Sequence, residues 1–295
     1  MRQLLMVHGR AQQAKDPVGL KKEWISAWEK GLKANGLSNP LPDEEIRFAY
    51  YGDTLIQMVN GMSAGDAAAV IAKGPAPTSA EQEVMREMIA EIAAHEGVAE
   101  VDIRAGLDSA VIAKGPANWG WVQGILTALD RVSPVSSAMV SLVTADVAKY
   151  LTNPAIRSKI DNGVRDALLP GKEAVVVSHS LGTVVAYNVL MGRVAAFPAI
   201  KVPLFVTLGS PLAVNAIKSR IRPHTFPKQV KAWYNAMDPD DVVSLYPLSK
   251  KHFDTGGTID NHDKVKNHTD NQHGISGYLD DPKVAKRIYD AVVAS

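Results

Sequence analysis

The sequence predicts an α/β protein in which a mainly parallel sheet is covered by helices on both faces. Short apolar runs with few charges recur along the chain, and the stretches between them repeat apolar residues every three or four positions. The short runs are typical of buried strands and the longer stretches of amphipathic helices. Strands that alternate with helices favour crossover connections, which make the strands parallel.

The first elements are a strand, a helix and a second strand. Leu4–Val7 is a short apolar run that ends at a His-Gly turn, as a buried strand does. Residues 18–34 are predicted to form a helix, because Leu20, Trp24 and other apolar residues recur at helical spacing among Lys and Glu. A second strand is expected at Ile46–Tyr51, where a Gly-Asp pair closes it.

The segment from Thr54 to about Leu168 contains no convincing strand and is predicted to be an inserted group of helices. Its apolar residues form helical stripes centred on residues 84–92, 122–129 and 139–151. The predicted core therefore comprises residues 1–53 and 169–295, and residues 54–168 form a helical cap. The last helix of the cap, over 156–168, is expected to return to the sheet and belong to the core.

This cap contains a near-repeat of eight residues. The letters AVIAKGPA occupy residues 69–76 and again residues 110–117. Two copies are too few for a solenoid, which needs about three or more. The simplest interpretation is a local duplication that produces two similar turns, and the sequence indicates no function for it.

The remaining elements follow the cap. Uncharged residues at Ala174–Val177 predict a third strand, and further strands are expected at Val202–Leu208 and Val230–Ala236. A last helix is predicted to begin at Asp281–Pro282, because Asp is a favourable cap and Pro fits the first helical position.

The composition is that of an ordinary globular protein and argues against several classes of function. Of 295 residues, 46% are hydrophobic and 21% are charged, and 32 Lys and Arg against 31 Asp and Glu give a formal net charge of +1. This balance argues against a general nucleic-acid binder or a polybasic membrane binder, although a local basic patch is compatible with it. Without cysteine, the chain has no disulfide, thiolate metal site or cysteine nucleophile.

No targeting or membrane-spanning segment is expected. The apolar run at the N-terminus is too short for a signal peptide. The longest uncharged apolar stretch, residues 174–191, is interrupted by a polar Ser-His-Ser cluster and by Gly182. We therefore expect a soluble, cytoplasmic protein without an integral membrane segment, whose oligomeric state the sequence leaves open.

The strongest indication of chemistry lies where the third strand meets the next helix. Residues 175–185 read VVVSHSLGTVV, which places Ser180 on a strand–turn–helix connection. Such a turn holds a serine in a strained conformation with its hydroxyl clear of the sheet. Small residues are needed two positions before and after it, and Ser178 and Gly182 meet this need. A serine that only caps the helix is the alternative, but the flanking strand and helix favour a nucleophile.

With this motif the sequence resembles the α/β-hydrolase family, in its compact lipase- and esterase-like branch. Ser178 departs mildly from the family pattern, which usually has glycine there. The resemblance implies a minimal sheet and a catalytic serine, acid and histidine in that chain order, with no cofactor or metal. The segments that carry the resemblance are Val7–Arg10, Ser178–Gly182, Leu208–Pro211, Asp238–Val243 and His273–Gly274.

A serine hydroxyl needs a base within hydrogen-bond reach, and the base needs an orienting partner. The family places its base in a loop after the last core strand. Four histidines lie in this tail of the chain. We prefer His273, which comes just before the terminal helix, and His268 is the alternative base.

The resemblance also implies that the acid follows the fifth strand, where three carboxylates compete. We prefer Asp241, because it runs into two valines much as in lipase-like members. Asp238 and Asp240 are the alternative acids. The remaining two carboxylates are expected to be solvated or to cap a turn.

Two backbone amides are expected to stabilise the oxyanion. One belongs to Leu181, which follows the nucleophile, and the other to Arg10, which follows the first strand. The resemblance gives His8 and Ser210 structural rather than catalytic roles.

The resemblance thus implies a serine hydrolase that cleaves a carboxylic ester through an acyl-serine intermediate, as a carboxylesterase or lipase does. Its expected partner is a small-molecule ester with an apolar portion, not a nucleic acid. A thioesterase, amidase or lactonase with the same triad is an alternative, as is a non-catalytic hydrolase-like binding protein. A metallohydrolase is a further alternative, although the spacing of its candidate ligands matches no metal motif. These candidate ligands are His262, Asp263, His268, Asp270 and His273.

Overall fold

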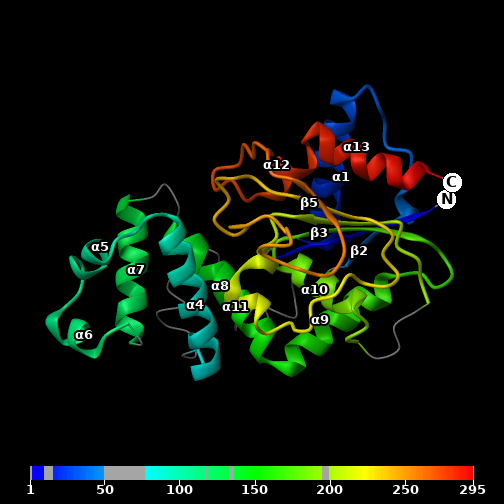
Figure 1. Cartoon of the computed structure of the whole chain (residues 1–295). Helices are drawn as coiled ribbons and strands as arrows, with labels where there is room; N and C mark the ends of the chain where they lie inside the picture. Colours follow the sequence, from blue (N-terminus) through cyan, green and yellow to red (C-terminus); the bar gives the residue numbers. More distant parts are fainter. Residues whose placement is uncertain are drawn as a thin grey trace.

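A computed structural model describes residues 2–9, 16–49, 77–116, 118–132, 136–194 and 199–294. Over these residues, six parallel strands form one sheet in the order β2-β1-β3-β4-β5-β6. Helices cover both faces of this sheet (Figure 1), so the predicted α/β class is confirmed. The strands are β1 (Gln3–Val7), β2 (Ile46–Ala49), β3 (Ala174–His179), β4 (Leu204–Leu208), β5 (Trp233–Ala236) and β6 (Ile259–His262).

Side chains alternate along the central strands, and both sets are buried. Leu5 and Val7 of β1 belong to the apolar core on one face of the sheet, whereas Leu4 and Met6 belong to the core on the other face. All four side chains are fully buried. A parallel sheet needs cover on both faces, which explains why its central strands are continuous apolar runs.

Three helices of the described part of the chain form the layer on one face. Asp16 begins the first of them by accepting the amide hydrogens of the first turn, and the indole of Trp28 donates to the carbonyl of Ala285 at 3.1 Å. The predicted start of the last helix at Asp281–Pro282 is confirmed. The helices of this layer are α1 (Pro17–Ala34), α12 (Ile275–Leu279) and α13 (Pro282–Val293).

The opposite face is covered by α9 and α10, and the core on this side continues into a further group of helices. α8 packs against α4, α9 and α10, while α4 also packs against α7 and α11. In Figure 1, α4 to α7 lie to one side of the sheet. The cap boundaries at 54 and 168 stay a prediction. The helices on this side are α4 (Ser79–His95), α5 (Glu100–Arg104), α6 (Ser109–Lys114), α7 (Trp119–Val132), α8 (Ser137–Thr152), α9 (Pro154–Ala167), α10 (Leu181–Leu190) and α11 (Asn215–Lys218). The described residues also form 3₁₀ turns at Asp43–Glu45 and Pro211–Ala213.

The sheet also differs from the prediction in its outer part. β6 was not expected, because its sequence Ile-Asp-Asn-His is polar and partly exposed. Among the described strands it pairs only with β5, and an edge strand need not carry the apolar pattern of a strand buried on both faces. The fourth and fifth strands are shorter than predicted, because Val202 and Val230 form only an isolated bridge ahead of them.

The second copy of the near-repeat forms α6 and the turn that ends it. Gly115 has φ of +72°, a conformation that ends a helix and favours glycine. The first copy, residues 69–76, and the final Ala117 lie outside the described residues. The proposed duplication therefore stays a prediction.

The longest uncharged stretch of the sequence folds as β3, the turn at Ser180 and α10. Every residue of α10 is buried, because this helix packs between the sheet and the other helices of its layer. Within the described ranges, no helix combines the length and the apolar character needed to cross a bilayer.

Two glycines allow β1, β3 and α10 to approach each other closely. A Cβ atom on Gly9 would lie 2.5 Å from Cβ of Ser180, and one on Gly182 would lie 2.4 Å from the carbonyl oxygen of Val7. Neither separation is sterically possible. Glycine is therefore required on both sides of the turn that carries Ser180.

Gly182→Ala is expected to lower the free energy of unfolding by roughly 1–3 kcal/mol, because the new methyl group meets backbone oxygens that cannot move aside. Gly163→Ala is the matched control, since a Cβ atom at this position of α9 meets nothing within 4 Å. The control should stabilise the chain by about 0.5–1 kcal/mol through its helix propensity. Urea unfolding of both variants tests this, and a Gly182→Ala protein as stable as the wild type would contradict it.

Candidate active site

Ser180 occupies the turn between β3 and α10 in a strained backbone conformation. Its φ of +55° and ψ of −131° are rare for a residue with a side chain and cost about 1–3 kcal/mol. Neighbouring elements hold it there: its amide donates to the carbonyl of Leu208 at 3.0 Å, and its carbonyl accepts from the hydroxyl of Thr183 at 2.7 Å. Among the described non-glycine residues, only Gln272 shares a positive φ.

A chain of hydrogen bonds joins Ser180, His273 and Asp241. His273 Nε2 lies 2.8 Å from Ser180 Oγ, and His273 Nδ1 lies 2.8 Å from Asp241 Oδ2. The three residues follow β3, β6 and β5, at the edge of the sheet where the carboxyl ends of parallel strands meet and ligands commonly bind. All three side chains are buried. The structure thus brings together the serine, base and acid preferred from the sequence.

Three donors surround the carboxylate of Asp241. The ring of His273 and the hydroxyl of Tyr278, at 2.5 Å, contact Oδ2, and the amide of Val243 donates to Oδ1 at 2.9 Å. Burial alone raises the pKa of Asp241, but the charge of a protonated His273 and these hydrogen bonds outweigh it and hold the pKa below the ordinary 3.8. Asp241 is therefore ionised at neutral pH and can stabilise an imidazolium.

The alternative acids do not contact His273. Asp238 Oδ2 accepts the amide of Asn267 at 2.5 Å, and its Oδ1 accepts the amide of Asp240 at 2.8 Å. The side chain of Asn267 donates in turn to the carbonyl of Gly274 at 2.8 Å. Asp238 therefore fastens the loop that carries His273 to the loop that carries the acid, while Asp240 is exposed.

The alternative base, His268, pairs with a different carboxylate. It is exposed, and its Nε2 lies 2.8 Å from Asp280 Oδ2. His262 likewise lies near Asp281, at 3.7 Å. The candidate metal ligands of the tail are thus dispersed, and the part of the chain that the structure describes contains no group of three or more His, Asp or Glu side chains able to hold a metal ion.

His179 contacts both the backbone and the ring of His273, and the sequence predicted no role for it. Its Nε2 lies 2.8 Å from the carbonyl of His273, and the two ring centroids are 4.7 Å apart. Burial lowers the pKa of His179 to about 3, and the charge of His273 contributes in the same direction. His179 is therefore neutral and donates to the backbone of His273. Its place between the two serines of the motif was visible in the sequence, but its distant partner was not.

Tyr278 is a second residue of the site without a predicted role. Its hydroxyl donates to Asp241 and accepts from the amide of Asp238 at 3.2 Å. Burial, with the charge of Asp241 as a further cause, raises the pKa of Tyr278 well above 10. The hydroxyl therefore stays protonated as a donor. In the sequence, Tyr278 was indistinguishable from an ordinary core residue of a short helix.

The structure describes one of the two predicted oxyanion donors, Leu181. Leu181 is the first residue of α10, where an amide has no acceptor inside its own helix. A Cβ atom on Gly9 would lie 3.0 Å from this amide, so the end of β1 lies beside it. Arg10, the second predicted donor, lies outside the described residues.

Two further serines near Ser180 have structural partners. Ser178 donates to the carbonyl of Val206 at 2.9 Å, which satisfies its hydroxyl inside the sheet where glycine is usual in the motif. The hydroxyls of Ser210 and Thr183 are 2.8 Å apart. Because Thr183 uses its single hydrogen on the carbonyl of Ser180, Ser210 donates to Thr183 and supports the turn indirectly.

No model of a known protein family matches the chain, and no curated protein matches it. Its function is therefore inferred from the geometry around Ser180. This geometry combines a hydroxyl, a base in contact with it and an acid in contact with the base, which are the parts of nucleophilic catalysis.

Tyr278→Phe is expected to destabilise the chain at neutral pH by roughly 1.5–3 kcal/mol, because a hydrogen bond to a buried charged group is lost. The folded-state pKa of Asp241 lies below its ordinary value of 3.8, so its ionisation stabilises the fold above that pH. This contribution disappears as the pH falls through the folded-state pKa. The destabilisation should therefore be largest at pH 7 and shrink in acid.

Unfolding curves at several pH values measure this effect, with Tyr289→Phe as the control. No described residue forms a hydrogen bond with the hydroxyl of Tyr289, so its removal should change the stability little at any pH. A loss for Tyr278→Phe at pH 7 no larger than that of Tyr289→Phe would show that the hydroxyl does not stabilise the charge of Asp241.

Proposed function

We propose that the chain is a serine hydrolase of the α/β-hydrolase fold that cleaves carboxylic esters. One observation carries the proposal: His273 lies within 2.8 Å of both Ser180 Oγ and Asp241 Oδ2, while Ser180 stands on a strand–turn–helix connection at φ +55°. The parallel sheet, with all three residues at the carboxyl edge, supports the same fold.

In the proposed reaction, Ser180 Oγ attacks the acyl carbon of the ester while His273 Nε2 accepts its proton. Asp241 stabilises the resulting imidazolium. The amide of Leu181, with Arg10 as the second proposed donor, stabilises the negative oxygen of the tetrahedral intermediate. His273 then gives the proton to the alkoxy oxygen, the carbon–oxygen bond breaks and an alcohol leaves.

The second half of the reaction releases the acid. Water attacks the acyl-serine and gives a proton to His273, which returns it to Ser180 Oγ as the acyl–serine bond breaks. No cofactor or metal takes part in these proposed steps. We expect the helices α4 to α8 to contribute to substrate choice, because the binding pockets of such enzymes are built by caps and loops.

The surroundings of His273 support its proposed role as a base. Ser180 and His273 have exposures of 3% and 6%, and charge interactions are stronger in such a dry site than in water. His179 is neutral beside it, since burial lowers the pKa of His179 to about 3. A charged ring at this distance would oppose the protonation of His273 during the reaction.

Wild-type protein is expected to react with a fluorophosphonate probe and to hydrolyse p-nitrophenyl esters, whereas Ser180→Ala should do neither. Ser210→Ala is the matched control, because Ser210 is a buried serine near the same turn whose partner is Thr183. It should keep its reaction with the probe. Ester hydrolysis retained by Ser180→Ala would refute the serine mechanism.

The same measurements separate the alternative functions. A folded wild type that does not react with the probe would favour a non-catalytic binding protein. Reaction with the probe without ester hydrolysis would direct attention to thioesters, amides or lactones, which the same triad can cleave. Activity that a chelator abolishes and that Ser180→Ala retains would favour the metallohydrolase.

Asp241→Asn is expected to lower kcat/KM by roughly 10³–10⁴-fold, because the amide leaves His273 in the wrong tautomer and its imidazolium without a counter-charge. Asp238→Asn should lower kcat/KM far less, but reduce the stability by about 1–3 kcal/mol through the weakened contact with Asn267. Kinetics at a temperature where both variants are folded test this. A larger kinetic loss for Asp238→Asn would make Asp238 the acid instead.

A further inference from the structure

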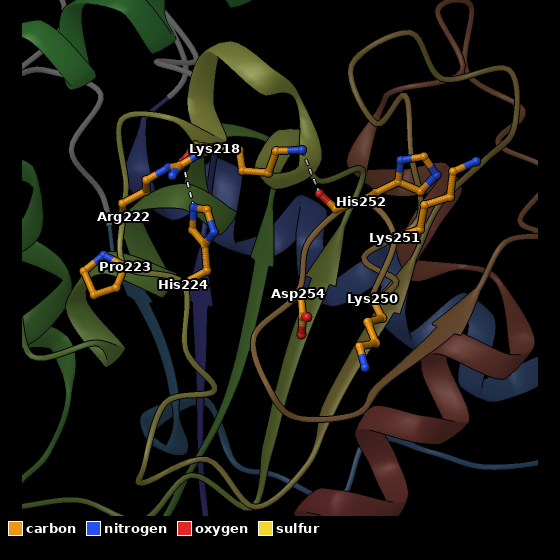
Figure 2. A pocket seen from close by; sticks show the side chains of 8 residues that line it. All are labelled: Lys218, Arg222, Pro223, His224, Lys250, Lys251, His252 and Asp254. Atoms are coloured by element: carbon orange, nitrogen blue, oxygen red, sulfur yellow. Dashed lines mark hydrogen bonds between the residues drawn. The ribbon is translucent and has the colours of Figure 1, made fainter.

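A pocket of about 670 Å³ with a mainly cationic lining lies between α11 and the connection that joins β5 to β6 (Figure 2). One wall comes from α11 and the turn that follows it, and the other from the connection between β5 and β6. Neither Ser180, Asp241 nor His273 lines it. The lining residues are Lys218, Arg222, Pro223, His224, Lys250, Lys251, His252 and Asp254.

One hydrogen bond joins the two walls, and a second lies within the wall formed by α11 and the turn that follows it. Lys218 Nζ donates to the carbonyl of His252 at 2.9 Å, and His224 Nε2 lies 2.7 Å from the carbonyl of Lys218 (Figure 2). Between His252 and Asp254, the fully buried Phe253 anchors the second wall, and its ring centroid lies 5.1 Å from that of His224. The pocket is therefore preformed on the aromatic core.

The turn that carries Arg222 is held by the guanidinium of Arg193. Arg193 Nη2 donates to the carbonyls of Ile221 and Pro223 at 2.6 and 2.7 Å, and its Nη1 donates to Asn188 of α10 at 2.6 Å. These bonds fix the backbone on both sides of Arg222. The guanidinium of Arg222 is thus presented from a rigid turn.

The charge of the pocket is unbalanced, although the whole chain is nearly neutral. Four lining side chains are cationic, and no carboxylate of the described residues forms an ion pair with any of them. The lining contains one carboxylate, Asp254, which accepts the amide of Gly256 at 3.0 Å. The charge of Lys218 acts to lower the pKa of Glu91, but the carboxylate oxygens of Glu91 accept hydrogen bonds from the backbone and side chain of Asn215. Four cationic side chains therefore line the pocket, and within the described residues only Lys218 among them donates a side-chain hydrogen bond.

We propose that this pocket binds a small molecule that carries two or more phosphate groups. Phosphate oxygens accept hydrogen bonds from Lys, Arg and His, and the cations compensate their charge. The volume falls within the range of about 300–1,000 Å³ that is typical of small-molecule sites. It is larger than one phosphate needs, which favours a ligand with several.

Other partners fit the pocket less well. An apolar ligand would meet few apolar side chains, since Pro223 is the only apolar residue among the described residues of the lining. Insertion of an apolar face into a membrane is also disfavoured, because the large apolar residues that are exposed among the described residues, Val18, Val101 and Val293, do not line the pocket. A nucleic acid requires an extended basic stripe rather than one pocket.

Calorimetric titration of the full chain with phosphate, pyrophosphate and tripolyphosphate tests the proposal. Tripolyphosphate should bind most tightly, because its charge is highest, and raising the salt should weaken its binding. Combined Arg222→Gln, Lys250→Gln and Lys251→Gln should weaken it by at least about tenfold. The control combines Lys22→Gln, Lys33→Gln and Lys283→Gln, which remove the same charge from exposed positions outside the pocket, and should leave the affinity unchanged.

Three results would overturn the proposal. Tripolyphosphate could fail to bind the wild type saturably, or the two triple variants could lose affinity equally, which would indicate a general charge effect. Anionic vesicles or a phosphopeptide could also bind at these residues while tripolyphosphate does not, which would assign the pocket to a macromolecular surface. None of these readouts requires Ser180, so failure here is separate from failure of the proposed hydrolase activity.

Discussion

The close approach of β1, β3 and α10 around Ser180 is the constraint on which the rest of the site depends. It leaves no space for a side chain at Gly9 or Gly182, and it forces Ser180 to a positive φ. The cost of this strain is met by the sheet, because the amide of Ser180 completes the pairing with Leu208. A wider approach would move the hydroxyl of Ser180 away from His273.

The loops that face Ser180 are ordered mainly by contacts with each other. Asp238 accepts a hydrogen bond from Asn267, whose side chain donates to the carbonyl of Gly274. The hydroxyl of Tyr278 donates to Asp241 and accepts from the amide of Asp238. Each buried polar group in this network has a partner, which is what allows it to persist out of water. The position of His273 is therefore a property of two loops and a helix together, rather than of the segment in which it occurs.

Local patterns predicted what local sequence determines. The central strands could be predicted because they are apolar on both faces. Ser180 could be predicted because its strand, turn and helix are consecutive in the sequence. β6 could not be predicted, because an edge strand can be polar. Long-range contacts escaped prediction: Tyr278 meets Asp241 from 37 positions away, and His179 meets His273 from 94. The choice of His273 over His268 depended on a family resemblance, because only the fold reveals that His268 pairs with Asp280.

The position of β6 at the edge of the sheet has a consequence for how heat would inactivate the protein. His273 lies in the loop that follows β6, whereas Ser180 follows a central strand. Edge elements open at a lower free-energy cost than central ones. If the two residues act together as proposed, warming would separate base from nucleophile by local fraying while most of the sheet persisted. Thermal inactivation would then precede melting, and it would be reversible on cooling as long as the central strands stayed paired.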